Sequence, residues 1–191
     1  MTNKADERPA TLGFLALVET ATKDGFLGAI LVADKHGVPR EFRCTYSVKP
    51  TAVQRLLYGA ALESYVGVQL CGIPLLQSIQ YKPDLILVDR ESLLEVRSSC
   101  ACPIVFVRKA GEAVTIETQG SSTASAPKER LESPTGRFQP IICAAHSSFT
   151  GDAQIAKDLL SDPTVVVDPL EPFARIAKAM EVLGKQDQKF Q

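Results

Sequence analysis

The sequence has little aromatic material: tryptophan is absent, and aromatic residues make up 6% of the 191 positions. Aromatic rings form the stacking platforms on which many proteins hold single-stranded nucleic acid, so this scarcity gives no indication of such a surface. An excess of one charge is also absent, because 21 basic and 22 acidic side chains leave a formal net charge of -1. A polybasic protein that coats nucleic acid or a membrane is therefore excluded, whereas a local basic patch is not.

Long hydrophobic runs are missing as well. The apolar runs are the size of strands, as in Phe26–Ala33, and none approaches the roughly 18 to 20 residues that span a bilayer. Residues 1–10 are polar and of mixed charge, which predicts no secretion signal. The five cysteines are odd in number and three lie in apolar or strand-like contexts, which predicts reduced thiols and a cytoplasmic location.

The first fifty residues predict an antiparallel meander. Turn-prone segments separate three short apolar or alternating runs, which are Gly13–Glu19, Leu27–Asp34 and Arg40–Val48. Pro39 limits pairing at the start of the third run, so we expect that strand near an edge of the sheet.

After Pro50 the period of the pattern changes. Thr51 and Gln54 form a capping-box signature. Apolar residues then recur at helical spacing, namely Val53, Leu56, Leu57, Ala60, Ala61 and Tyr65. We therefore predict one helix that ends at Gly67, followed by a second short helix over Pro74–Gln80.

The middle of the chain predicts a parallel unit. Asp84–Val88 and Pro103–Val107 are continuous apolar runs, typical of strands that are covered on both faces, and Arg90–Arg97 predicts a short helix between them. Ala113–Thr118 alternates and predicts an antiparallel edge strand. The sheet is therefore expected to be mixed.

The last third begins with a segment rich in Ser, Thr, Pro, Gly and charge, Gln119–Gly136, which predicts a flexible insertion or linker. Two strand-then-helix units follow it: Pro140–Ala144 with Asp152–Leu160, and Thr164–Val167 with Glu171–Leu183.

These elements together predict an α/β fold, a three-layer domain with a mixed sheet. Residues 11–118 and 137–184 form the domain, residues 119–136 the insertion, residues 1–10 a polar leader and residues 185–191 a polar tail.

Ends of the predicted strands carry the candidate catalytic residues, because ligands of parallel α/β sheets bind outside the carboxyl ends of the strands. Asp89, His146 and Asp168 each follow an apolar run, and such a set could hold Mg²⁺ or Mn²⁺ and activate water against a phosphate ester. A local interpretation remains open for each. Asp89 and Asp168 stand where helix N-caps are expected, and His146 lies in a loop whose polar side chains can satisfy their own backbone.

Candidate binding residues lie near the strands and their ends: Arg40, Arg43, Arg108, Ser147 and Ser148. The two arginines around the third run could face a phosphate backbone. Alternation places Arg43 on the solvent face, where a charged side chain is the default.

Fingerprints of several enzyme classes are missing. The close cysteine pair, Cys100 and Cys102, has one residue between its members and no second ligand pair, so a structural zinc site is not expected. No hydrolase elbow, phosphate-binding P-loop or dinucleotide-binding glycine motif is present.

The passage DLILVDRESLLEVRSSCACPIVFVR, residues 84–108, resembles proteins related to endonuclease V with the ribonuclease H-like fold. A three-stranded meander before a helix is compatible with that architecture. The resemblance implies a metal-dependent nuclease. Its first strand, GFLALVE, departs from the pattern, because it lacks the internal aspartate that such metal nucleases use.

No coherent catalytic constellation emerges from these residues. We therefore predict a cytoplasmic, non-enzymatic binding or assembly subunit without a cofactor, which uses exposed strand edges and the amphipathic last helix to bind a protein partner or a second copy. The alternative is a metal-dependent phosphodiesterase or nuclease that uses Asp89, His146 and Asp168. Nucleic acid is a possible partner on either view, and a membrane is not.

Overall fold

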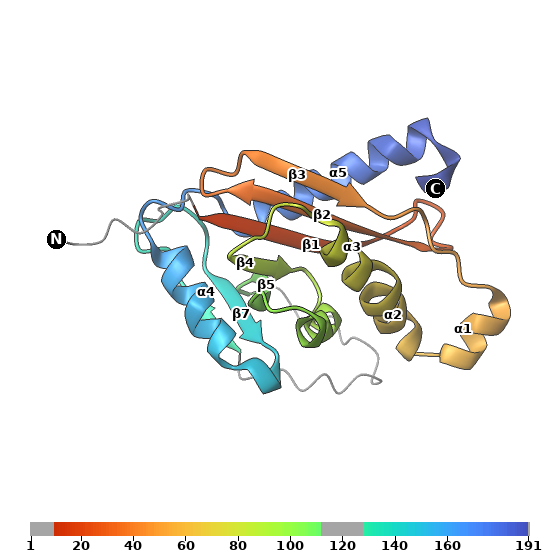
Figure 1. The fold of residues 1–191 in the computed structure, drawn as a ribbon, viewed down its shortest axis with the longest axis horizontal. Helices are drawn as coiled ribbons and strands as arrows, with labels where there is room; N and C mark the ends of the chain where they lie inside the picture. The colour runs from red at the N-terminus through yellow and green to blue at the C-terminus, as the bar shows by residue number, and fades with distance from the viewer. Residues whose placement is uncertain (1–9, 112–127, 191) are drawn as a thin grey trace.

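A computed structural model of the chain describes residues 10–111 and 128–190, which form a seven-stranded mixed sheet with helices on both faces (Figure 1). The strands are β1 (Thr11–Glu19), β2 (Phe26–Asp34), β3 (Pro39–Cys44), β4 (Leu85–Val88), β5 (Ile104–Lys109), β6 (Glu129–Leu131) and β7 (Ile141–Ala145). Their order across the sheet is β3-β2-β1-β4-β5-β7-β6. The predicted α/β class with a mixed sheet is confirmed.

Strand directions divide the sheet into three parts. The meander β1–β2–β3 is antiparallel, with β3 at one edge as predicted. Strands β1, β4 and β5 are parallel to one another. Strand β7 is antiparallel to β5, and β6 pairs antiparallel with β7 at the other edge. The direction of β7 turns its carboxyl end toward the amino ends of β4 and β5.

Two apolar layers fill the space between the sheet and its helices because alternate strand residues point to opposite faces. Leu12, Phe14 and Ala16 of β1 face the layer under α4 (Gly151–Ser161) and α5 (Glu171–Gln186). Leu15 and Leu17 face the other layer. That layer lies under α2 (Ala61–Tyr65), a π-helical segment (Val66–Gly72), α3 (Ile73–Ser78) and a 3₁₀ helix (Glu91–Ser99).

The single helix predicted up to Gly67 is interrupted. The capping box is present, with Thr51 and Gln54 bonded reciprocally, but α1 (Ala52–Tyr58) ends at Gly59, whose φ of 51° is the left-handed conformation that favours glycine. No residue of α1 is buried. Val53, Leu56 and Leu57 are 64%, 84% and 78% exposed, although apolar residues at this spacing usually face a core. Helix α1 stands out from the body of the molecule (Figure 1).

Other boundaries differ from the prediction. Residues 164–167 are irregular rather than a strand, although Val165 and Val167 are buried. The predicted insertion 119–136 includes β6, whose Leu131 is also buried, while Ala113–Thr118 lies outside the described residues.

The carboxyl-terminal end is more structured than the predicted polar tail. Helix α5 continues to Gln186 with Pro172 in its first turn, where the missing N–H costs nothing. A 3₁₀ turn, Gln188–Phe190, follows, and Phe190 packs against the core.

Across the described ranges, no single helix is long and apolar enough to cross a membrane. Helix Ala52–Tyr58 and the helical stretch Ala61–Ser78 meet the criteria of length and apolar composition only as a pair, and they are bent by 102° at the break.

Candidate functional site

Asp89 lies directly after β4, at the carboxyl end of the parallel strands. It does not cap the helix that follows. The cap position is Arg90, which has extended backbone and makes no side-chain capping bond. The Oδ1 atom of Asp89 is shielded from solvent and has no hydrogen-bond partner in the structure. A buried polar atom without a partner is uncommon in native proteins and often marks a functional group.

Burial governs the ionisation of Asp89. It raises the pKa of this carboxyl from its ordinary value of 3.8 to about 6, because the charged form loses solvation. The positive charge of Arg90 and the backbone N–H of Leu17 act in the opposite direction, and the nearby Glu63 carboxylate adds to the rise. A carboxyl whose pKa approaches neutrality is suited to accept or donate a proton at physiological pH.

Arg90 connects Asp89 to the helical layer. Its Nε donates to the carbonyl of Leu17 at 3.2 Å, and its Nη1 forms an ion pair with Glu63 of α2. The Arg90 and Glu63 side chains are 25% and 41% exposed. We call Asp89, Arg90 and Glu63 the strand-end cluster.

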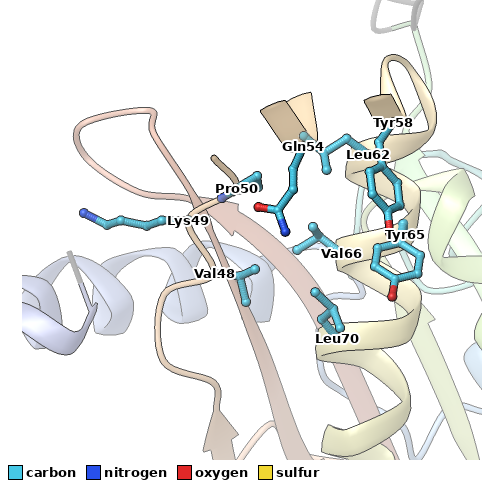
Figure 2. Close-up of a pocket in the computed structure, with 9 residues that line it drawn as sticks. All are labelled: Val48, Lys49, Pro50, Gln54, Tyr58, Leu62, Tyr65, Val66 and Leu70. Atoms are coloured by element: carbon cyan, nitrogen blue, oxygen red, sulfur yellow. The ribbon is translucent and has the colours of Figure 1, made fainter. Parts of the chain in front are cut away.

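A cleft opens on the neighbouring side of α2, with a cavity of about 140 Å³ (Figure 2). We call it the tyrosine cleft; it is lined by Val48, Lys49, Pro50, Gln54, Tyr58, Leu62, Tyr65, Val66 and Leu70. The rings of Tyr58 and Tyr65 lie against each other, with centroids 4.9 Å apart. Gln54 supplies an amide, whose Oε1 accepts from the backbone N–H of Thr51 at 2.8 Å. The Lys49 side chain points away from the other lining side chains (Figure 2), and its ammonium pairs with Asp24 at 2.9 Å. The cleft therefore combines aromatic and apolar side chains with one amide.

Helix α2 joins the cleft to the cluster. Leu62 and Tyr65 line the cleft, while Glu63 between them pairs with Arg90. Helix α2 therefore contributes side chains to both features. The low aromatic content of the sequence gave no indication of the tyrosine cleft, because two of the four tyrosines gather in one place.

The donors at the strand-end cluster do not fit a resident Mg²⁺ or Mn²⁺ ion. Among residues 10–111 and 128–190, no group of three or more His, Cys, Asp and Glu side chains is arranged to hold a metal. Strand β1 contributes the buried Leu15 and Leu17 on this face instead of a carboxylate. Glu63 is already paired with a guanidinium. Asp89 is left as the carboxylate that has no ion pair within the described ranges.

His146 lies at the opposite end of the parallel strands. It follows β7, whose Ala145 pairs with Val105 at the beginning of β5. Along the strands, His146 and Asp89 are separated by about three residues, or roughly 10 Å. Across the strands, they are separated by two strand spacings of about 4.8 Å each. His146 is buried; its Nδ1 accepts from the backbone N–H of Ser148 at 3.1 Å, and its Nε2 lies 3.5 Å from Glu95. These contacts match the local interpretation.

The surroundings of His146 form a structural network. Arg97 donates to the buried Asp152 at 2.6 Å, and Asp152 also accepts from the backbone N–H of Ile104 at 3.0 Å. The Arg97 guanidinium lies 4.2 Å from the centre of the Phe149 ring, which in turn packs against His146. This network ties the 3₁₀ helix after β4 to the beginning of α4.

Asp168 also lies away from Asp89. It precedes α5 and accepts from the backbone N–H of Leu170 at 2.8 Å. The backbone nearby, at Val166, bonds to Lys35 after β2, beside the start of β1. About five residues of β1, or roughly 17 Å, separate that end from the level of Asp89. The structure therefore does not bring Asp89, His146 and Asp168 together, because β7 runs antiparallel and residues 164–167 are not a strand.

The predicted binding residues are dispersed. Arg40 pairs with Asp34 at 2.7 Å and Arg43 with Glu41 at 2.8 Å, both on the edge strand β3. Arg108 lies on β5, and Ser147 and Ser148 follow β7 at the other end of the sheet. These five residues do not form one surface.

All five cysteines are free thiols in the structure. Burial raises the pKa of Cys102 and of Cys143 to about 12, so neither thiol is activated as a nucleophile.

Comparison with known proteins gives similarity in structure but not in sequence. No family model matches the chain, and no curated protein matches it significantly. Human endonuclease V has a TM-score of 0.59 at 12% identity over 97% of this chain and 89% of its own. Endonuclease V from Bacillus subtilis gives 0.51 at 14% identity over 99% of this chain and 90% of its own.

A third similar structure contains nucleic acid. Endonuclease V from Ciona intestinalis, in complex with a 23mer DNA that contains an inosine followed by a ribo-adenosine, has a TM-score of 0.54 at 13% identity. The match covers 94% of this chain and 88% of that one.

These matches correct the leading functional prediction. Solved proteins that share the fold over nearly the whole chain are nucleases, so the prediction of a non-enzymatic binding or assembly subunit is wrong, and the nuclease alternative is the better supported one. Asp89, His146 and Asp168 do not form one site, since of the three Asp89 alone lies at the carboxyl end of β4.

Proposed function

We propose that this protein acts on nucleic acid as a phosphodiesterase, at the surface formed by the strand-end cluster and the tyrosine cleft. Nearly the whole chain is similar in fold to endonuclease V, and one of those structures is in complex with DNA. At this level of identity the similarity concerns the fold, so the argument for function rests on the residues at this surface.

The tyrosine cleft supports binding of an unpaired base. Its cavity of about 140 Å³ is close to a cavity of about 150 Å³ that holds benzene, so it has room for one six-membered ring. Every base has a face that stacks on an aromatic ring, and such stacking contributes about 1–3 kcal/mol per base. The Gln54 amide nitrogen can donate to a base edge.

Asp89 supports the chemical step. A carboxylate here can accept a proton from a water molecule as the water oxygen attacks phosphorus and the bond to the leaving oxygen breaks, while that oxygen takes a proton from solvent. A pKa of about 6 leaves the carboxyl mostly ionised at neutral pH, as a group that accepts a proton must be. Shielding from bulk solvent strengthens the electrostatic interactions of this group.

The test uses the full chain with end-labelled single-stranded and double-stranded DNA and RNA, with and without an inosine. Strand products are followed on denaturing gels in Mg²⁺, in Mn²⁺ and in EDTA. We expect single-stranded or unpaired substrates to be cut, and Asp89→Asn to reduce the rate at least about 100-fold while binding persists. Asp158→Asn, an exposed carboxylate on α4, is the matched control and should act like the wild type. Absence of strand products with every substrate under all three conditions would refute the proposal.

The cellular context stays a prediction from the sequence. The odd number of cysteines and their apolar or strand-like contexts support a cytoplasmic location, and a second copy of the chain or another protein is a further proposed partner.

A further inference from the structure

Arg90 occupies the centre of the strand-end cluster. Its guanidinium donates to the Leu17 carbonyl at 3.2 Å and pairs with Glu63, and it is the residue next to Asp89. We infer that the Arg90 guanidinium, rather than a divalent cation, supplies the fixed positive charge of this site.

The donor set leads to this inference. A cation at this end of the sheet would need Asp89 and Glu63 together, because β1 presents leucines there. The negative charge of Glu63 is already neutralised by its ion pair with the Arg90 guanidinium, which is always protonated. A divalent ion between the two carboxylates would lie next to the Arg90 guanidinium, which the Leu17 carbonyl holds in place. The two positive charges would repel each other strongly in this partly buried site.

The guanidinium also has the chemistry for a phosphate. Its planar set of donors matches phosphate oxygens, and its pairing with Glu63 holds it ready beside Asp89. On the basis of the proposed function, we expect this chain to bind a nucleic-acid strand at the strand-end cluster without a divalent metal.

Titration with Mn²⁺, followed by the paramagnetic resonance of the free ion, tests the inference without reference to activity. The wild type should bind Mn²⁺ only weakly. Arg90→Gln removes the positive charge but keeps a donor for the Leu17 carbonyl, and we expect it to bind one Mn²⁺ at least about tenfold more tightly. Arg90→Lys keeps the charge and should show no gain. The double variant with Asp89→Asn should lose the gain.

Arg43→Gln is the matched control, because Arg43 also forms an ion pair with a glutamate, on the edge strand β3. It should bind Mn²⁺ like the wild type. Tight stoichiometric Mn²⁺ binding by the wild type, or equal binding by the wild type and Arg90→Gln, would overturn the inference. Circular dichroism of each variant checks that it is folded.

A second measurement separates this inference from the proposed function. Oligonucleotide affinity, measured by fluorescence anisotropy at matched ionic strength, should change less than about twofold between EDTA and Mg²⁺, and should fall about tenfold in Arg90→Gln. Affinity that needs Mg²⁺ would overturn the inference alone. Failure of every oligonucleotide to bind or be cut would refute the proposed function and leave the Mn²⁺ comparison intact.

Discussion

Replacement of Asp89 by asparagine should stabilise the protein at neutral pH. The carboxyl is buried beside β4 with an unpartnered Oδ1, and its pKa rises from 3.8 to about 6 chiefly through desolvation. At about 1.4 kcal/mol per tenfold change in proton affinity, this rise corresponds to about 3 kcal/mol of lost folding free energy once the group is ionised in both states. Asparagine has the same shape, keeps an acceptor for the Leu17 N–H and carries no charge.

The protonation of Asp89 in the folded and unfolded chains gives the sign of this stability effect at each pH. Below about pH 4 the carboxyl is protonated in folded and unfolded chains alike, so it contributes no difference. Between pH 4 and 6 the unfolded chain has released the proton that the folded chain still holds, so stability falls as the pH rises. Above pH 6 the carboxyl is ionised in both states, and its desolvation lowers the free energy of unfolding by the full amount. Asp89→Asn should therefore match the wild type near pH 4 and exceed it by up to about 3 kcal/mol near pH 7.

Urea unfolding at half-unit steps from pH 4 to 8, followed by circular dichroism, measures this difference. Asp158→Asn controls for the loss of one negative charge, since Asp158 is exposed on α4. A stability difference that stays constant with pH, or an Asp89→Asn protein that is less stable at pH 7, would refute the argument that Asp89 is held ionised against a desolvation cost.

Three further outcomes are expected. Arg97→Ala leaves the buried Asp152 unpaired, and should lower the free energy of unfolding by about 3–5 kcal/mol in urea titrations. Thr51→Ala removes the capping box of α1 and should reduce helical circular dichroism slightly, yet change global stability by less than about 0.5 kcal/mol because α1 buries nothing. Tyr65→Ala should weaken binding of single-stranded oligonucleotides by about tenfold in fluorescence anisotropy without loss of folding, since the ring is 40% exposed.

Local patterns were sufficient to predict much of the fold. The apolar or alternating runs of β1 to β3, the continuous apolar runs of β4 and β5 and the capping box at Thr51 each depend on a few neighbouring residues. The direction of β7 is not, because an apolar run of five residues reads the same in either orientation. That direction decides at which end of the sheet His146 lies, so the predicted three-residue site depended on a feature that no local pattern encodes.

The candidate site was predicted in part. Asp89 was identified as the residue after a buried strand, and the structure adds that it caps nothing. Glu63 and Arg90 were missed, because their role comes from a contact between positions 27 residues apart. Tyr58 and Tyr65 carried an available signal, since a spacing of seven places two side chains on one face of a helix. The break at Gly59 still leaves their rings adjacent.

Helix α1 also has a consequence for the dynamics of the molecule. A seven-residue helix with no buried side chain is held by its cap, by a bond from Arg55 to the carbonyl of Asp24 and by few other contacts, so little free energy opposes its local opening. Its amides should exchange with solvent well before those of β1. Because α1 carries Gln54 and Tyr58, one side of the tyrosine cleft can open and close locally while the sheet and Asp89 remain fixed. The free energy needed to order α1 then reduces the affinity of the cleft for any ligand.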